Sequence, residues 1–168
     1  MRLNVGCGKR ILDGYVNIDA VPREGVDIVA PALKIPLSGG GAEELMAIHL
    51  FEHIEPWDAP KALAEWHRLL APGGLLVLEM PDIVKCAQNL IKLIDRGDPK
   101  QLASLAMHGI YGDASLKDPW MLHRWGYTFK TLAPMLKAAG FTKIREATTQ
   151  WHPIGRAHRD FRVEARRA

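Results

Sequence analysis

The sequence predicts a layered α/β fold, with a mainly parallel β-sheet and helices on both faces. Short apolar runs typical of buried strands alternate with longer segments that carry apolar residues at helical spacing. Near the start, the apolar run Leu3–Val5 meets the turn Gly6-Cys7-Gly8, and the next apolar run ends on Asp19. A strand, a glycine turn, a strand and an acid in this order indicate a nucleotide-type site at the carboxyl edge of the sheet.

Length and composition predict a single domain over residues 1–168. Apolar residues make up 48% and charged residues 24% of the chain, and no apolar run approaches the length of a membrane span. The two cysteines provide neither a disulfide framework nor a metal cluster, and Met1 leads almost directly into the first strand. We therefore expect a cytoplasmic protein without a signal peptide.

Turn residues divide the apolar runs into separate strands. The clearest strand is Leu75–Met80, which follows the breaker Pro72-Gly73-Gly74. The other strands are expected at Leu3–Val5, Tyr15–Ile18, Val26–Val29, Leu45–Leu50, Thr142–Thr148 and Phe161–Ala165.

Three segments have the apolar stripe and the end signals of helices. The first is Asp58–Leu70, the second begins after the predicted N-cap Asp82 and runs to about Ile94, and the third is Thr128–Ala139, which ends at Gly140. A variable helical insertion is expected at about residues 83–127.

The links after the first two strands are short. The link between Gly8 and Tyr15 consists of residues 9–14, and the link between Asp19 and Val26 consists of residues 20–25. Parallel strands usually need a crossover of about a dozen residues or more that contains a helix. We therefore expect shortened crossovers and a sheet face that partly lacks helices. Either the segment from about Lys85 to Tyr127 or a second subunit would cover it, and on this ground we hypothesise a homodimer.

Positive charge gathers near the C-terminus of this chain, whose net charge is +3. The arginines concerned are Arg156, Arg159, Arg162, Arg166 and Arg167. Such a cluster is typical of a nucleic-acid-binding patch or of a solvated edge strand protected by charge. We favour the edge strand, because no stacking aromatics are interleaved with the arginines.

Several blocks together resemble the class I S-adenosylmethionine-dependent methyltransferases, whose fold is Rossmann-like. The resemblance is strongest to small bacterial predicted methyltransferases that begin at the glycine motif. The blocks cover most of the chain and follow the family's order: LNVGCGKR (Leu3–Arg10), GYVNIDA (Gly14–Ala20), LFEHI (Leu50–Ile54), EWHRLLAPGGLLVLEMPD (Glu65–Asp82) and HRWGYTFKTLAPMLKAAGF (His123–Phe141).

The resemblance implies S-adenosylmethionine as the cofactor and S-adenosylhomocysteine as the product. Asp19 is expected to accept hydrogen bonds from the ribose hydroxyls, and its alternative role is to form a turn before Val21-Pro22. Cys7 is interpreted as a small core residue within the turn. The expected cofactor-binding residues are Gly6, Cys7, Gly8, Lys9, Asp19, Ala20, Leu33, His49 and Leu50.

Two positions depart from the family pattern. Lys9 and Arg10 stand where a third glycine commonly follows the first motif, as in the subgroup with a short turn. Pro31-Ala32-Leu33 stands where many relatives carry an acid near the adenine, which would then be met by backbone carbonyls or water. A nicotinamide enzyme is disfavoured, because Ile11 occupies the third glycine position of the dinucleotide fingerprint.

The implied reaction is an in-line displacement of the sulfonium methyl group by an O, N, S or C nucleophile. The candidate catalytic residues are His53 and Glu52, which lie with His49 where the methyl group is expected to point. His53 could act as a general base, although we prefer the interpretation in which Glu52 and His53 cap and orient the next segment. We expect no metal, because the spacing does not place two ligands on one helix face and no cysteine joins them.

The candidate substrate-binding residues are Asp82, His123 and Arg124. Asp82 is needed as an N-cap whatever else it does. Arg124 could hold an anionic substrate by a bidentate contact, or it could anchor the insertion to the sheet together with His123. Three tryptophans could form an aromatic wall, but buried packing is preferred for Trp120, Trp125 and Trp151.

We therefore expect a methyltransferase that acts on a small-molecule acceptor or on a saccharide- or lipid-linked acceptor. DNA base methylation is disfavoured, since no Asn/Asp-Pro-Pro-Tyr segment follows the fourth strand. Two alternatives remain. One is a module of the same fold that binds the cofactor or its product without transferring a methyl group, and the other is an RNA-binding protein that uses the arginine-rich end.

Overall fold

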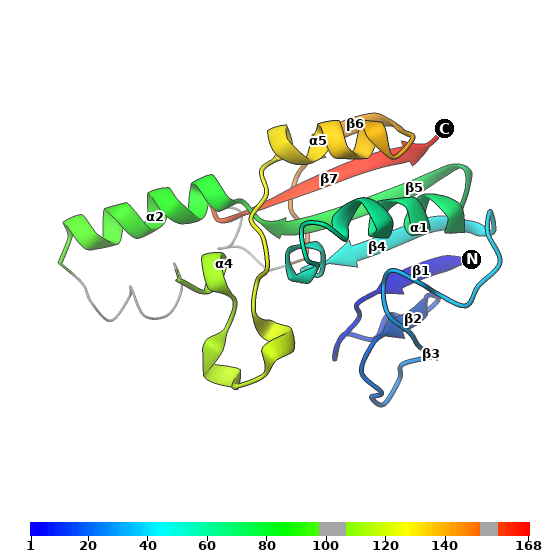
Figure 1. Ribbon diagram of the computed structural model, residues 1–168, viewed down its shortest axis with the longest axis horizontal. Coiled ribbons are helices and arrows are strands. Elements are labelled where there is room, and N and C mark those ends of the chain that lie inside the picture. The colour runs from blue at the N-terminus through cyan, green and yellow to red at the C-terminus, as the bar shows by residue number, and fades with distance from the viewer. Residues whose placement is uncertain (98–106, 152–157) are drawn as a thin grey trace.

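The computed structural model describes residues 1–97, 107–151 and 158–168. Its centre is a seven-stranded sheet with the order β3-β2-β1-β4-β5-β7-β6 (Figure 1). The first five strands run parallel, and β7 is antiparallel to both β5 and β6, which confirms the predicted mainly parallel sheet. The strands are β1 (Arg2–Val5), β2 (Val16–Asp19), β3 (Ile28–Val29), β4 (Ala42–Ile48), β5 (Leu70–Pro81), β6 (Phe141–Ala147) and β7 (Asp160–Arg167).

Two strand boundaries differ from the prediction for local reasons. β4 ends at Ile48 because His49 has a positive φ of 50°, which turns the backbone out of the strand. β5 begins at Leu70, directly after the preceding helix, and its pairing register with β4 shifts before Leu75. The predicted breaker Pro72-Gly73-Gly74 therefore lies in an irregular stretch of β5.

Helix α2 begins at its predicted cap, and α5 begins after a cap that was not predicted from the sequence. Oδ1 of Asp82 accepts hydrogen bonds from the backbone N–H groups of Val84 (2.9 Å) and Lys85 (3.1 Å), and Thr128 forms a capping box with Thr131. None of the helices in the described residues combines enough length and apolar character to cross a membrane. The helical elements are η1 (Phe51–His53), α1 (Ala59–Leu69), α2 (Ile83–Asp95), α4 (Met107–Tyr111), η3 (Ala114–Leu116), η4 (Pro119–Met121) and α5 (Phe129–Ala138).

The main core lies between the sheet and the two helices α1 and α5 (Figure 1). Alternate strand residues such as Leu45, Leu76 and Val163 point into it and are almost fully buried. Trp66 of α1 is fully buried as well, and its indole Nε1 donates to the carbonyl of Ala32 at 3.0 Å. This bond fixes the segment that follows β3.

Loop segments cover the opposite face of the sheet. The links after β1 and β2 contain no helix, which confirms the predicted short crossovers. We expected either the segment Lys85–Tyr127 or a second subunit to cover this face. The described part of Lys85–Tyr127 contributes no residue to the apolar cluster found there, and a homodimer stays a prediction. The small apolar cluster on this face consists of Met46, Ile48 and Val77, with Leu12, Tyr15, Leu75 and Trp151 packed against it.

Two asparagines, Asn4 and Asn17, hold the loop that connects β1 to β2 without a helix. Asn17 is buried, and its Oδ1 accepts hydrogen bonds from Asn4 Nδ2 and from the backbone N–H of Leu12, both at 2.9 Å. Its Nδ2 donates to the Leu12 carbonyl at 3.1 Å. Asn17 thereby satisfies the backbone of a loop that has no helical hydrogen bonds of its own.

The arginines of β7 are engaged in contacts within the protein. Arg162 lies 3.4 Å from Glu79 and 3.2 Å from Glu164, and Arg166 donates to the carbonyl of Gly73 at 3.0 Å. The expected edge position is wrong for this strand, because β7 lies between β5 and β6. Arg156 lies outside the described residues. The ion pairs favour a structural role of these arginines over a nucleic-acid patch.

Replacing Asn17 by alanine should lower the free energy of unfolding by about 1–3 kcal/mol, because buried groups of Asn4 and Leu12 lose their partner. Urea denaturation followed by circular dichroism measures the change. The matched control is Asn89→Ala, whose side chain makes an exposed hydrogen bond to the His158 carbonyl at 3.4 Å. Equal losses in the two variants would contradict the role of Asn17.

Candidate functional site

The glycine turn joins the ends of β1, β2 and β4. Gly6 has a φ of 69°, its N–H donates to the Ile18 carbonyl at 2.8 Å, and a Cβ there would lie 2.7 Å from the Leu50 side chain. Gly8 has a φ of 55°, and a Cβ there would meet no atom within 4 Å. Glycine is thus needed at Gly6 for close packing, whereas the main chain at Gly8 faces open space that a ligand can enter.

Asp19 holds this turn in place. Its Oδ2 accepts a hydrogen bond from the N–H of Gly8 at 2.8 Å, and its Oδ1 accepts one from the N–H of Val21 at 2.9 Å. A carboxylate oxygen has two lone-pair sites, so each oxygen can accept a further hydrogen bond. The turn-forming and the ligand-binding interpretations of Asp19 are therefore compatible.

The other predicted cofactor residues differ in exposure. Burial, with a smaller effect of Asp19, raises the pKa of the Cys7 thiol to about 11, as expected for a packed cysteine. Lys9 and Ala20 are exposed, and Leu33 packs against the main core.

His49 lies between two buried carboxylates. Its Nδ1 is 3.1 Å from Glu52 Oε1, and its Nε2 is 3.4 Å from Asp160 Oδ2. Burial by itself lowers the pKa of His49, but the hydrogen bonds to Asp160 and Glu52 outweigh it and raise the pKa to about 9. At neutral pH His49 is therefore a cation that links η1 to the start of β7.

The two carboxylates stay ionised in return. Burial raises the pKa of Asp160, but His49 and Arg159 outweigh it and lower the pKa to about 2. Arg159 Nε lies 2.6 Å from Asp160 Oδ1. In the same way burial raises the pKa of Glu52, while the bond from His49 brings it below the usual value.

The segment before α5 docks onto η1. The carbonyl of Glu52 accepts hydrogen bonds from the N–H groups of Arg124 (2.7 Å) and Trp125 (3.2 Å), and His53 Nδ1 lies 3.1 Å from the Leu122 carbonyl. These contacts agree with an orienting role for Glu52 and His53. They also bring His123 Nε2 to 4.0 Å from Glu52 Oε1, although the two residues are distant in the sequence.

The predicted substrate residues are only partly brought together. Burial lowers the pKa of His123 to about 4, so its imidazole is neutral beside Glu52. The Arg124 side chain instead lies 3.6 Å from Glu55, where both side chains are exposed. Asp82 lies beside Tyr127 in a parallel bridge while its carboxylate caps α2.

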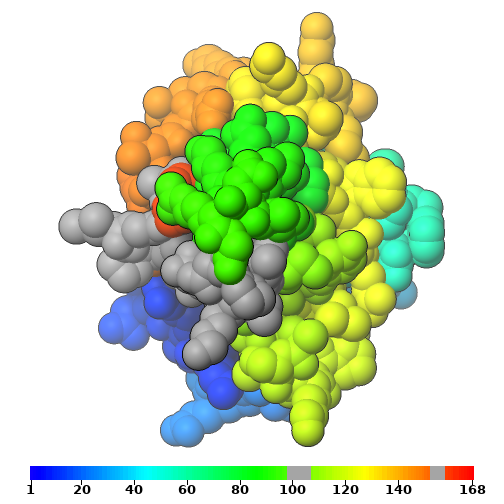
Figure 2. All heavy atoms as spheres, turned by 90° about the vertical axis from the view of Figure 1, so that its left-hand side faces the viewer, coloured from blue at the N-terminus to red at the C-terminus, as the bar shows by residue number. Residues whose placement is uncertain are grey.

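Buried packing was the wrong expectation for two of the tryptophans. Trp120 is 65% exposed and Trp125 is 54% exposed. Both belong to the insertion at the carboxyl edge of the sheet. Figure 2 looks onto this edge, where the yellow-green residues of the insertion and the blue N-terminal residues both reach the surface. An apolar cavity of about 420 Å³ beside Trp125 is lined by Ile83, Trp125, Gly126, Tyr127, Thr131 and Met135.

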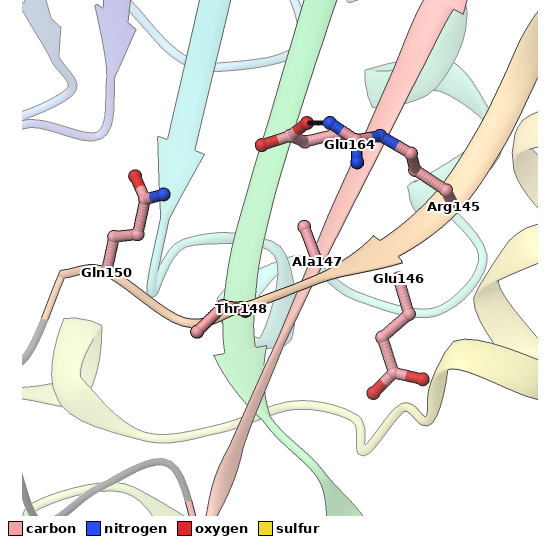
Figure 3. A pocket seen from close by; sticks show the side chains of 6 residues that line it. All are labelled: Arg145, Glu146, Ala147, Thr148, Gln150 and Glu164. Carbon is pink, nitrogen blue, oxygen red and sulfur yellow. Dashed lines mark hydrogen bonds and ion pairs between the residues drawn. The ribbon is translucent and has the colours of Figure 1, made fainter.

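A second cavity, of about 490 Å³, lies at the β6 end of the sheet (Figure 3). An ion pair of 2.5 Å between Arg145 and Glu164 crosses it, and Gln150 points in from the loop after β6. Strands β7, β5 and β4 separate β6 from β1, so this cavity is distinct from the glycine turn.

Asp160 is the site residue that sequence reasoning missed. Nothing in its local sequence connects it to His49. Its position follows from the antiparallel register of β5 and β7, in which Asp160 is the partner of Pro81 at the carboxyl end of β5. Only the pairing of these strands brings it to the same edge as His49.

Comparison with known proteins agrees with this architecture. Residues 15–78 match the family model described as a methyltransferase domain. The fold is similar to that of solved methyltransferases, which match this chain over 99% of its length. The chain has the class I methyltransferase fold. The resemblance of its sequence blocks to the S-adenosylmethionine-dependent methyltransferases is thereby confirmed.

Three solved structures illustrate the similarity. A possible exported protein from Bordetella parapertussis is 18% identical with a TM-score of 0.63, over 99% of this chain and 61% of that chain. The 1,6-didemethyltoxoflavin-N1-methyltransferase of Burkholderia thailandensis is 17% identical with a TM-score of 0.62, over 99% of this chain and 70% of that chain. An S-adenosylmethionine-dependent methyltransferase from Archaeoglobus fulgidus is 16% identical with a TM-score of 0.62, over 99% of this chain and 85% of that chain. This chain thus spans less than two thirds of the length of the Bordetella protein. A comparison with curated proteins found no match to this chain.

Replacing Asp160 by asparagine should lower the free energy of unfolding by about 2–3 kcal/mol, because the half-buried His49 cation loses one of its two buried carboxylate partners. Thermal and urea unfolding measure the loss. The control is Asp58→Asn, whose partner Lys61 is exposed, and the free energy of unfolding should fall by less than about 1 kcal/mol. Comparable effects of the two substitutions would contradict this account of the buried network.

Proposed function

We propose that the chain binds S-adenosylmethionine across the ends of β1, β2 and β4 and transfers its methyl group to a small-molecule acceptor. The observation that carries the proposal is the turn at Gly8, which faces open space while its N–H is bonded to Asp19. The turn lies beside the point between β1 and β4 where the strand order reverses. Ligands of open α/β sheets bind at such points, and the Burkholderia relative was solved with S-adenosylhomocysteine.

In this proposal the free lone pairs of Asp19 receive the ribose hydroxyls. The backbone from Gly6 to Lys9 flanks the cofactor, and Ala20 and Leu33 lie on the adenine side. Because Pro31-Ala32-Leu33 provides no acid, backbone carbonyls or water would meet the adenine amino group. His49 and Leu50, at the end of β4, would lie on the methyl side.

The cofactor supplies a methyl group on a sulfonium leaving group, so the chain mainly has to position the acceptor and exclude water. His49 is a cation at neutral pH and is unsuited to accept a proton. His53 is the better candidate base, since it is partly exposed and its Nδ1 faces the Leu122 carbonyl. Glu52 would act by positioning His53 and the segment from Leu122 to Trp125.

The acceptor would lie against the insertion. The apolar cavity beside Trp125 has the size of a small-molecule site, which supports an acceptor with an apolar or ring-shaped part, such as a saccharide- or lipid-linked metabolite. Asp82, His123 and Arg124 are the polar candidates for contacts to it. A cytoplasmic location and a homodimer remain predictions.

Asp19→Asn and Asp19→Ala should each weaken S-adenosylhomocysteine binding at least about tenfold, equivalent to about 1.4 kcal/mol. The reason is that each variant removes at least one charged acceptor for the ribose. Isothermal titration calorimetry measures the dissociation constant, and circular dichroism verifies that the fold is intact.

The control variant is Asp13→Ala, which removes an exposed carboxylate from the neighbouring loop. It should bind S-adenosylhomocysteine like the parent protein. An unchanged dissociation constant for both Asp19 variants would exclude Asp19 from the site. Absence of binding by the parent protein would contradict the proposed function.

Transfer of a radiolabelled methyl group to small-molecule fractions of a cell extract distinguishes an enzyme from a binding module. A labelled product that requires the parent protein supports transfer. Cofactor binding without any labelled product would favour the module. The RNA-binding alternative predicts binding that falls steeply with salt, whereas the paired arginines of β7 lead us to expect no such binding.

A further inference from the structure

Three side chains that could ligate a metal ion converge at the docking point of the insertion. Glu52 and His53 come from η1, and His123 comes from the segment before α5. One ligand atom from each residue lies within 4.8 Å of the others. The rings of His53 and His123 meet edge to face, with their centroids 4.8 Å apart.

A backbone carbonyl orients the imidazole of His53. His53 Nδ1 lies 3.1 Å from the Leu122 carbonyl, so this nitrogen carries the proton and Nε2 keeps its lone pair. The backbone of Gly109 lies close enough to raise the pKa of His123, and His123 Nε2 lies 4.0 Å from Glu52 Oε1. Metal-bound histidines are typically held in this way, with the second ring nitrogen bonded to a carbonyl or a carboxylate.

The carboxylate of Glu52 has one unused oxygen. Glu52 is 2% exposed, and its Oε1 is 3.1 Å from His49 Nδ1. Its Oε2 is buried and has no hydrogen-bond partner among the described residues. A buried carboxylate oxygen without a partner is costly. Because His123 approaches Oε1, a cation would satisfy Oε2 if the carboxylate bound it through both oxygens.

We propose that Glu52, His53 and His123 bind a divalent transition-metal ion. One carboxylate and two imidazoles form a donor set that suits zinc or iron(II) and leaves coordination positions open. Ligand atoms that share such an ion are about 3–4 Å apart, as follows from metal–ligand distances of about 2.1 Å. The 4.0 Å between His123 Nε2 and Glu52 Oε1 therefore requires only a small inward turn.

The sequence argued against a metal because the spacing of His49, Glu52 and His53 does not place two ligands on one helix face and no cysteine joins them. The fold directs His49 to Asp160 and supplies His123 in its place. With the ion bound, His53 Nε2 is a ligand, so His53 serves as the candidate base only in the ion-free protein. The open positions of the ion could hold an oxygen or nitrogen of the methyl acceptor, a role that rests on the proposed function. Ion binding itself does not depend on methyl transfer.

Cobalt(II) titration of chelator-treated protein tests the site, because the visible absorption of cobalt reports its ligands. We expect one cobalt ion per chain, displaced by zinc, without the sulfur charge-transfer bands that a cysteine ligand would give. Glu52→Gln and His123→Ala should weaken binding by more than about tenfold. The matched control, His108→Ala, removes a histidine of the same insertion that pairs with Asp113 at 3.6 Å, and should bind cobalt like the parent.

His53→Ala provides a third variant at a partly exposed position, should either buried substitution prevent folding. Absence of stoichiometric cobalt binding, or equal weakening by His108→Ala, would overturn the proposal. S-adenosylhomocysteine binding is measured in parallel in the presence of chelator. Cofactor binding without cobalt binding would refute the metal site alone, and cobalt binding without cofactor binding would refute the proposed function alone.

Discussion

The site depends on the two salt bridges that His49 makes to Glu52 and Asp160. They join the end of β4, the turn η1 and the start of β7. A cation held largely away from water needs a partner, and here two buried carboxylates share the half-buried His49. Because the carbonyl of Glu52 also receives the N–H groups of Arg124 and Trp125, the same network sets the position of the insertion.

The opposite face of the sheet shows how a methyltransferase fold can form without helices after β1 and β2. Helices normally satisfy their own backbone groups and bring apolar side chains to the sheet. Here Asn17 satisfies the loop backbone, and Leu12, Tyr15 and Trp151 provide the apolar cover. Glu79 contributes to the same cover, since it is buried and accepts hydrogen bonds from the N–H groups of Gln150 and Trp151.

The two ends of the site differ in chemical character. The glycine turn at Gly8 and Asp19 presents backbone and carboxylate groups to open space, which suits a polar nucleoside. The opposite end combines His53, ionised Glu52 and the neutral imidazole of His123 with exposed tryptophans. Cofactor and acceptor would therefore meet surfaces built from different segments of the chain, and variants on one side can be tested without altering the other.

Local sequence determined the strands, the caps Asp82 and Thr128, and the turn at Gly6 and Gly8. These features depend on short-range hydrogen bonding, allowed φ values and hydrophobic periodicity, all of which the sequence displays directly. The tertiary structure alone decided the pairing of His49 with Asp160, the approach of His123 to Glu52 and the interior position of β7. Those contacts depend on strand register and on the docking of segments far apart in the chain, and no local pattern encodes them.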